Sequence, residues 1–358
     1  MRRPIFATLG LALATLLASC ALAETLLVVR KSADALDFVD PGSGLRLATV
    51  ELGHAPHEVS VAPDGRRAAV SNYGTRERPG STLSIVDLER PRELVRIDLM
   101  PHTRPHGVDW FAPDRIAVTT EGSQHLLVVD PDASRIVLAV PTAQEVSHMV
   151  AVAANATRAF VANIGSGSTT AIDLAAGRRL RDIPTGKGSE AIALSPDGRE
   201  LWVGAREVDQ VVIVDTDSLE IEATLAVPGI PIRIALAPDG HTAFVTCAGT
   251  GELVAIDTAP RRARARAKIA VPMATDAAPR PYARLSAGSV LPVGLLVSRD
   301  GRSVYVAATM GDAIAHFDAA TVALQQTTPV GGEPDGLGLT PVLPRAECHA
   351  CAPDQLLR

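Results

Sequence analysis

Short runs of alternating hydrophobic and polar residues fill most of the chain. A period of two is typical of β-strands, and no segment keeps the longer period of an amphipathic helix. One run stands out at 57–65 as HEVSVAPDG and returns as EAIALSPDG at 190–198, IRIALAPDG at 232–240 and VGLLVSRDG at 293–301. Three of these runs end in Pro-Asp-Gly and the fourth in Arg-Asp-Gly, which are typical of tight turns. The pattern therefore predicts an all-β protein built from a repeated unit.

The spacing of this unit predicts the fold. With its looser copies, the unit starts at residues 57, 106, 148, 190, 232, 293 and 335, so four of the six intervals are 42 residues long. Each complete unit holds four strand-like runs, the size of one β-propeller blade. The last unit has only its first strand, and three further runs stand at 24–52. We therefore predict a seven-bladed β-propeller of four-stranded antiparallel blades over 24–344, closed by residues 335–341 pairing with 24–52.

Two motifs connect the repeats to known families. The second strands read FVAN at 160–163 and FVTC at 244–247, each after a turn of the Pro-Asp-Gly kind. They resemble the YVTN-type (YncE-like) repeats of extracytoplasmic propellers, which implies this fold and a role as a binding platform. In one blade, Asn72-Tyr73-Gly74 followed by STLSI at 81–85 is similar to lactonase-type propellers, which act on sugar lactones.

The first residues indicate export. Arg2 and Arg3 precede an apolar stretch at 5–17, and Ala21-Leu22-Ala23 has the small residues of a cleavage site, so residues 1–23 read as a signal peptide. In an alternative interpretation, residues 17–20 resemble a lipobox in which Cys20 is lipidated, and only then do we expect membrane contact. The protein is expected to be periplasmic, or else a membrane-anchored lipoprotein.

Charge and cysteines narrow the choice of partners. The net charge is −6, and removal of residues 1–23 with their two arginines leaves −8. Such a chain lacks the basic surface that nucleic-acid binding requires. In the C-terminal tail at 345–358, Cys348 and Cys351 are candidates for a local disulfide in an oxidising compartment. We expect a monomer.

The repeat also predicts where a site lies. Equivalent positions of successive blades share one end of the central channel, and there the first residues of the units come together. They are His57, His106, His148, Glu190, Ile232, Val293 and Asp335. The loops between second and third strands would add Tyr73, Glu121 and Arg206, and Lys31 from the N-terminal unit.

The three histidines have more than one interpretation. As neutral imidazoles they are common ligands of transition metals, so His57, His106 and His148 are candidates to hold a divalent or transition metal ion. They are also candidates for handling a substrate or a proton, or for a purely structural role at strand starts. The aspartates that end the third strands, at 40, 87, 130, 173, 215, 257 and 318, are expected to form turns instead.

Three classes of function follow. The first is a binding or scaffold propeller that holds an unidentified small molecule or protein at the channel mouth. The second is a lactonase-like hydrolase or a lyase that uses the histidines with Glu190 or Glu121 as acid and base. The third is a metal-binding protein. The sequence contains no nucleophile or phosphate-loop motif that would select a reaction.

Overall fold

The computed structural model describes residues 24–275 and 288–345. The predicted signal peptide with Cys20, and the tail cysteines Cys348 and Cys351, lie outside the described residues. No helix among the residues described is long and apolar enough to cross a membrane.

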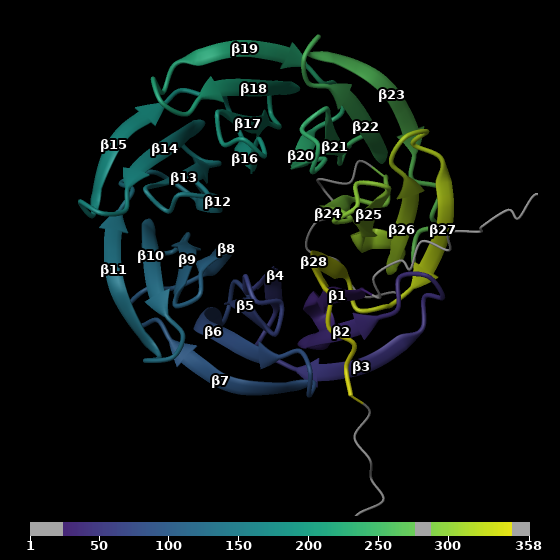
Figure 1. Ribbon diagram of the computed structural model, residues 1–358, viewed down its shortest axis with the longest axis horizontal. Helices are drawn as coiled ribbons and strands as arrows, with labels where there is room; N and C mark the ends of the chain where they lie inside the picture. The colour runs from purple at the N-terminus through teal and green to yellow at the C-terminus, as the bar shows by residue number, and fades with distance from the viewer. Residues whose placement is uncertain (1–23, 276–287, 346–358) are drawn as a thin grey trace, which may run out of the picture.

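Seven four-stranded antiparallel sheets surround a central channel, which confirms the predicted propeller (Figure 1). We number the blades by the order of the repeats, so that blade 1 begins at His57 and blade 7 at Asp335. In each blade the first strand is innermost and the fourth lies on the rim of the disc (Figure 1). The only helical elements in the described ranges are two single turns of 3₁₀ helix, η1 Lys31–Ala33 and η2 Thr309–Gly311.

The strands are five to nine residues long, and the four strands of a blade follow one another along the chain except in blade 7. Blade 1 is β4 Pro56–Val61, β5 Arg67–Gly74, β6 Pro79–Asp87 and β7 Arg92–Asp98. Blade 2 is β8 Pro105–Ala112, β9 Arg115–Thr120, β10 His125–Asp130 and β11 Arg135–Pro141. Blade 3 is β12 Ser147–Val152, β13 Arg158–Asn163, β14 Ser168–Asp173 and β15 Arg178–Ile183. Blade 4 is β16 Ser189–Leu194, β17 Glu200–Ala205, β18 Gln210–Asp215 and β19 Ile221–Ala226. Blade 5 is β20 Pro231–Leu236, β21 Thr242–Cys247, β22 Glu252–Asp257 and β23 Arg262–Lys268. Blade 6 is β24 Pro292–Val297, β25 Ser303–Ala308, β26 Ala313–Asp318 and β27 Leu324–Pro329. Blade 7 is β28 Pro334–Thr340, β1 Thr25–Arg30, β2 Ala35–Val39 and β3 Arg46–Glu51.

Blade 7 joins the two ends of the propeller. Strand β28 supplies its inner strand and pairs antiparallel with β1, with Thr25 opposite Thr340 and Leu27 opposite Gly338. In Figure 1 the yellow β28 accordingly lies beside the purple β1. The pairing covers strand edges that would otherwise be open, and it makes the ring continuous.

The hydrophobic core is divided among the blade interfaces. Each pair of neighbouring blades buries its own cluster of mostly aliphatic side chains, and seven such clusters run around the ring. In the cluster between blades 7 and 1, Leu27 and Phe38 pack with Val70 and Val86. Small and branched side chains suit these closely stacked sheets, which explains why a chain with only 3% aromatic residues can fill its core.

Six of the seven aspartates at the ends of the third strands make the predicted turn contacts, whereas the Asp257 carboxylate forms an ion pair with Arg264. Asp130 accepts the backbone N–H groups of Asp132 and Ala133, and Asp215 accepts those of Asp217 and Ser218. Equivalent turn contacts are present for Asp40, Asp87, Asp173 and Asp318.

Around the channel the inner strands come so close that some positions require glycine. A Cβ atom on Gly294 would overlap the carbonyl oxygen of Asp335 on the neighbouring strand β28. Gly107 and Gly336 stand at the same repeat position and face the carbonyl oxygens of His148 and His57. Because these contacts involve backbone atoms on both sides, a side chain there would push neighbouring blades apart.

We therefore expect Gly294→Ala to lower the free energy of unfolding by about 1–3 kcal/mol, the usual range for overpacking. Gly42→Ala is the matched control, because its Cβ would meet nothing closer than 3.6 Å. Denaturant unfolding of both variants measures the difference. Equal stability of the two would contradict the close approach of blades 6 and 7.

Candidate functional site

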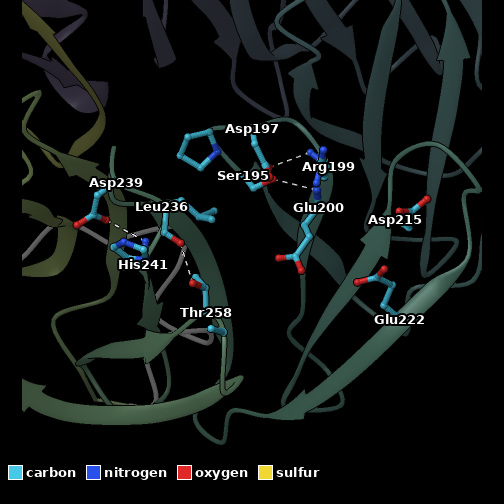
Figure 2. A pocket seen from close by; sticks show the side chains of 13 residues that line it. Ser195, Asp197, Arg199, Glu200, Asp215, Glu222, Leu236, Asp239, His241 and Thr258 are labelled. Atoms are coloured by element: carbon cyan, nitrogen blue, oxygen red, sulfur yellow. Dashed lines mark hydrogen bonds between the residues drawn. The ribbon is translucent and has the colours of Figure 1, made fainter.

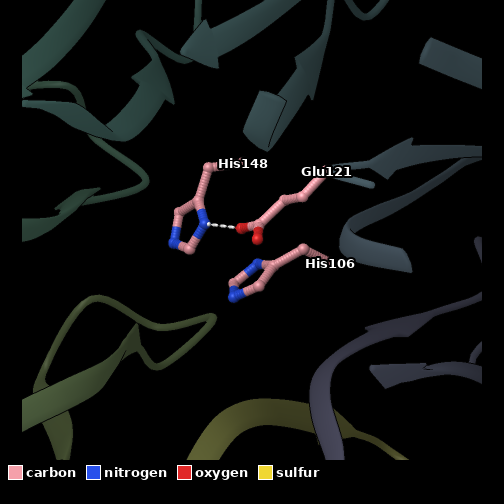
Figure 3. Close-up of side chains that lie close together, drawn as sticks. All are labelled: His106, Glu121 and His148. Carbon is pink, nitrogen blue, oxygen red and sulfur yellow. Dashed lines mark hydrogen bonds and ion pairs between the residues drawn. The ribbon is translucent and has the colours of Figure 1, made fainter. Parts of the chain in front are cut away.

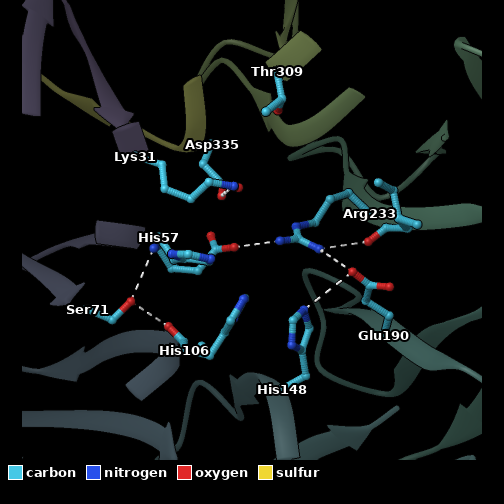
Figure 4. Close-up of polar contacts among 12 residues, drawn as sticks. Lys31, His57, Ser71, His106, His148, Glu190, Arg233, Thr309 and Asp335 are labelled. Atoms are coloured by element: carbon cyan, nitrogen blue, oxygen red, sulfur yellow. Dashed lines mark hydrogen bonds and ion pairs between the residues drawn. The ribbon is translucent and has the colours of Figure 1, made fainter. Parts of the chain in front are cut away.

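The channel mouth forms a cavity of about 270 Å³. Its lining includes all seven residues that open the repeats, from His57 to Asp335, together with Tyr73, Glu121 and Arg206. The structure thus brings together the seven repeat-opening residues and the three loop residues that the sequence placed at the mouth, and Figure 4 shows several of them around the channel. Lys31 is not part of the cavity lining but lies beside it, next to Asp335. Whether they bind a ligand stays a prediction.

The three histidines form a row along one side of the mouth. The ring centroids of His57 and His106 are 5.1 Å apart, and those of His106 and His148 are 3.6 Å apart. All three side chains are buried. Tyr73, from the end of β5, packs against both His57 and His106. The rings come from blades 1, 2 and 3, so equivalent positions of adjacent blades do meet.

His148 is held between two carboxylates. Its Nδ1 lies 2.5 Å from Glu121 Oε1, and its Nε2 lies 3.4 Å from Glu190 Oε1. Burial alone would lower the pKa of His148, but hydrogen bonds and charge from Glu121 and Glu190 outweigh it and raise the pKa to about 9. Burial opposes ionisation of Glu190 too, yet contact with His148 and the charges of Arg206 and Arg233 lower its pKa to about 2. His148 is therefore an imidazolium ion at neutral pH.

The other two histidines are neutral. Desolvation by burial, together with the Lys31 charge, lowers the pKa of His57 to about 4 against the opposing effect of Asp335. Desolvation and the neighbouring His148 charge hold the pKa of His106 well below its usual range. His57 Nδ1 lies 3.1 Å from the Ala55 carbonyl oxygen. The mouth therefore offers two neutral imidazoles beside one charged imidazole.

Arg233 also lines the mouth cavity and connects opposite blades. From blade 5 its Nη2 donates to Glu58 Oε1 of blade 1 at 2.6 Å, and its Nη1 lies 3.4 Å from Glu190 Oε1 (Figure 4). The sequence interpretation missed this pair. Glu58 and Arg233 each occupy the second position of their repeat, where the other blades have Gly, Met or Ala. This occurrence of two opposite charges at a repeat position that is otherwise small or apolar could have predicted the pair from the sequence.

The formal charges around the mouth balance. The carboxylates are Glu58, Glu121, Glu190 and Asp335, and the cations are Lys31, His148, Arg206 and Arg233. Lys31 Nζ lies 3.6 Å from Asp335 Oδ2, and Arg206 bonds to Glu190. With His57 and His106 neutral, the formal charges of these four carboxylates and four cations balance, although burial raises the pKa of Glu58 against the opposing charge of Arg233.

The remaining wall of the cavity is apolar. Ile232 and Leu291, from blades 5 and 6, belong to a small buried cluster with Ala248 and Met310, and Val293 packs against it. The mouth is therefore polar on the histidine side and apolar on the opposite side. Such a cavity can orient a small molecule that has one polar face.

Three of the mouth residues also have the spacing of metal ligands. Ligand atoms of His106, Glu121 and His148 all lie within 4.8 Å of one another (Figure 3). The sequence predicted a triad of His57, His106 and His148; in the structure Glu121 takes the place of His57 in this group.

A wider cavity of about 600 Å³ lies between blades 4 and 5, at the Pro-Asp-Gly turns (Figure 2). Its acidic groups already have structural partners. Asp197 accepts from Ser195 and the Arg199 backbone, and Glu200 accepts from Trp202 and Arg261. This cavity is explained by turn geometry and surface ion pairs, so we place the candidate site at the channel mouth instead.

Comparison with known proteins agrees with this fold. The model of the cytochrome D1 heme domain family matches residues 112–254, which is less than half of the chain. The match leaves out His57, Tyr73, His106 and Asp335. No curated protein matches the chain.

Two solved structures have the same architecture. One is Kuenenia stuttgartiensis hydrazine synthase, with a TM-score of 0.66 and 19% identity over 84% of this chain and 93% of that chain. The other is a functionally unknown protein from Desulfotomaculum acetoxidans DSM 771, with a TM-score of 0.72 and 13% identity over 90% of this chain and 99% of that one. At these identities the likeness extends to the fold alone.

The charged state of His148 predicts how stability depends on pH in chelator-treated, metal-free protein. Because its pKa is raised in the folded protein, its contribution is fully present below the unfolded value of 6.5 and is lost as the pH rises through about 9. The loss should be on the order of 3 kcal/mol. Groups facing His148 are Glu121, Glu190 and His106.

Thermal unfolding between about pH 6 and about pH 9.5 tests this expectation, because these limits bracket the titration of His148. The His148→Gln variant should be less stable at pH 6 and should lack most of the alkaline decline. A wild-type melting temperature that stays level across this range would show that His148 is not charged between the two glutamates.

Proposed function

We propose that this chain is an exported binding propeller, related to the YVTN-repeat type, that holds a small uncharged organic molecule at its channel mouth. The observation that carries the proposal is a preformed cavity with a charge-balanced polar wall opposite an apolar one. Export rests on the signal-like residues 1–23, and the family on the FVAN and FVTC strands.

Charge balance favours a neutral ligand. The buried ions already pair with one another, for example Arg233 with Glu58 and Arg206 with Glu190. A charged organic ligand that displaces none of these ions would enter a region of low dielectric without a free counter-ion, which is costly. A neutral ring with hydroxyl or carbonyl groups could instead exchange hydrogen bonds with the polar wall and pack on Ile232 and Val293. Sugars and sugar lactones have this chemistry.

The partial family match raises the question of a heme. The residues of the mouth do not fit one. The cavity of about 270 Å³ lies just below the usual range of drug-sized pockets, roughly 300–1,000 Å³. The rings of His106 and His148 are tilted against each other with centroids 3.6 Å apart, and together with the Arg233 bridge they leave no slot for a flat macrocycle among the described residues. We therefore propose no heme in this channel.

A hydrolase is the second candidate. Its support is the neutral His57 beside Tyr73, in the blade that carries the lactonase-like Asn72-Tyr73-Gly74 segment. A neutral buried imidazole can act as a general base toward a bound water molecule. The same neutral ligands would serve both functions, so product formation is what separates them.

Calorimetric titration with a panel of lactones and neutral cyclic sugars tests the binding function. We expect stoichiometric binding of at least one compound, weakened about tenfold or more in Val293→Phe, because the larger ring fills a small cavity. Arg199→Ala, in the wider cavity at the turns, is the control and should bind like the wild type.

Failure of every compound to bind, or equal affinity of Val293→Phe and the wild type, would reject this site. Release of the hydroxy acid from a lactone above the protein-free rate, lost in His57→Gln, would instead favour the hydrolase.

A further inference from the structure

His106, Glu121 and His148 bring three metal-binding side chains to the junction of blades 2 and 3. His106 stands on β8, Glu121 follows β9, and His148 stands on β12. Their ligand atoms lie within 4.8 Å of one another, and Figure 3 shows the two rings and the carboxylate facing a common point. The strands that carry them are rigid parts of the ring, so the spacing is preorganised.

A second observation at the same point is an unsatisfied nitrogen. His106 is only 4% exposed, and its Nδ1 is buried without a hydrogen-bond partner in the part of the chain that the structure describes. Buried polar atoms are nearly always paired, and an exception often marks a missing ion or water. The orphan nitrogen belongs to a neutral imidazole, which is the form that binds metals.

We propose that His106, Glu121 and His148 bind one divalent first-row transition metal ion, with Zn²⁺ as the simplest case. Two imidazoles and one carboxylate are a ligand set of catalytic zinc sites and of other divalent metals of this row. The same three residues line the mouth cavity, so the remaining coordination positions would face it. This inference is independent of the identity of any organic ligand.

The surrounding contacts suit such a site. Tyr73 Oη donates to Glu121 Oε2 at 2.5 Å, and Glu190 Oε1 lies 3.4 Å from His148 Nε2. A carboxylate behind a metal-bound histidine fixes its tautomer and orientation. His148 would then ligate through Nδ1, which now shares a proton with Glu121 at 2.5 Å. The metal displaces this proton to solvent and is paired directly with the Glu121 carboxylate, so the mouth gains one net positive charge rather than two. The two ligand atoms move apart to about 3.3 Å, as metal–ligand bonds of about 2.0–2.1 Å require.

Zn²⁺ titration of the full chain tests the proposal. Cys348, His349 and Cys351 in the tail could bind Zn²⁺ by themselves, so the titrations use a Cys348→Ser/Cys351→Ser background, stripped with a chelator. We expect one equivalent of Zn²⁺ to bind, and both His106→Gln and Glu121→Gln to weaken binding about a hundredfold or more.

Two controls define the site. His57→Gln should change the affinity for Zn²⁺ less than about threefold, because His57 is outside the three-residue group. If the metal were instead held by His57, His106 and His148, the same variant would no longer bind Zn²⁺ tightly. His102→Gln addresses the partly exposed pair His102 and His125, whose rings are 4.7 Å apart, and should also leave the affinity unchanged.

Co²⁺ provides a second readout that does not depend on affinity. Its visible absorption reports nitrogen and oxygen ligands, and this spectrum should be lost in His106→Gln and retained in Val293→Phe. Near-ultraviolet circular dichroism checks that the variants are folded.

The proposal is overturned if the background protein binds no stoichiometric Zn²⁺, or if folded His106→Gln and Glu121→Gln bind it as tightly as before. Because Val293→Phe tests the organic ligand alone, failure of either proposal can be recognised separately.

Discussion

The pairing of β1 with β28 is the constraint on which the rest of this structure depends. It joins residues more than three hundred positions apart, as in the match of Thr25 with Thr340, and converts a row of blades into a closed ring. The cluster between blades 7 and 1 is buried only because this contact exists. The mouth depends on the same pairing, because the pairing brings Lys31, which follows β1, to 3.6 Å from Asp335 on β28. The ends of the chain therefore determine whether a site forms at all, because the rim residues can face one another only around a closed circle.

Much of this could be predicted from the spacing of the repeats. Residues at one position of a repeat occupy one height in a propeller, so His57, His106 and His148 had to meet at one end of the channel once the ring was inferred. The directions of side chains across the channel were beyond such reasoning. Arg233 reaches Glu58, 175 positions away, and no local pattern encodes that contact. The charge states of the three histidines could not be predicted from the sequence either, because these equivalent residues differ only in which carboxylates lie beside them.

Those differences follow from the surroundings of each ring. His148 lies between Glu121 and Glu190 and is charged. His106, whose ring centroid is 3.6 Å from that of His148, is kept neutral by burial and by the His148 charge. Compared with apolar residues of similar volume, buried ion pairs contribute little net stability, since desolvation offsets their attraction, but neutralising one partner of an existing pair is costly. Their effect here is to fix geometry: removing one partner would leave an uncompensated charge next to the others. A network of this kind holds a site in one conformation before any ligand arrives.

Function in such a molecule resides where the repeats differ. The alternating strands and turn aspartates recur from blade to blade and build the ring, and close glycines stand at the inner strands of three blades. At the rim, by contrast, blades 1 to 4 present histidines and a glutamate, while blades 5 and 6 present Ile232 and Val293. A ring with identical rim residues would form a symmetric channel that gives a small ligand no preferred orientation. The unequal rim gives the mouth a polar side with neutral imidazoles and an apolar side, and only an asymmetric cavity can both bind and orient an asymmetric molecule.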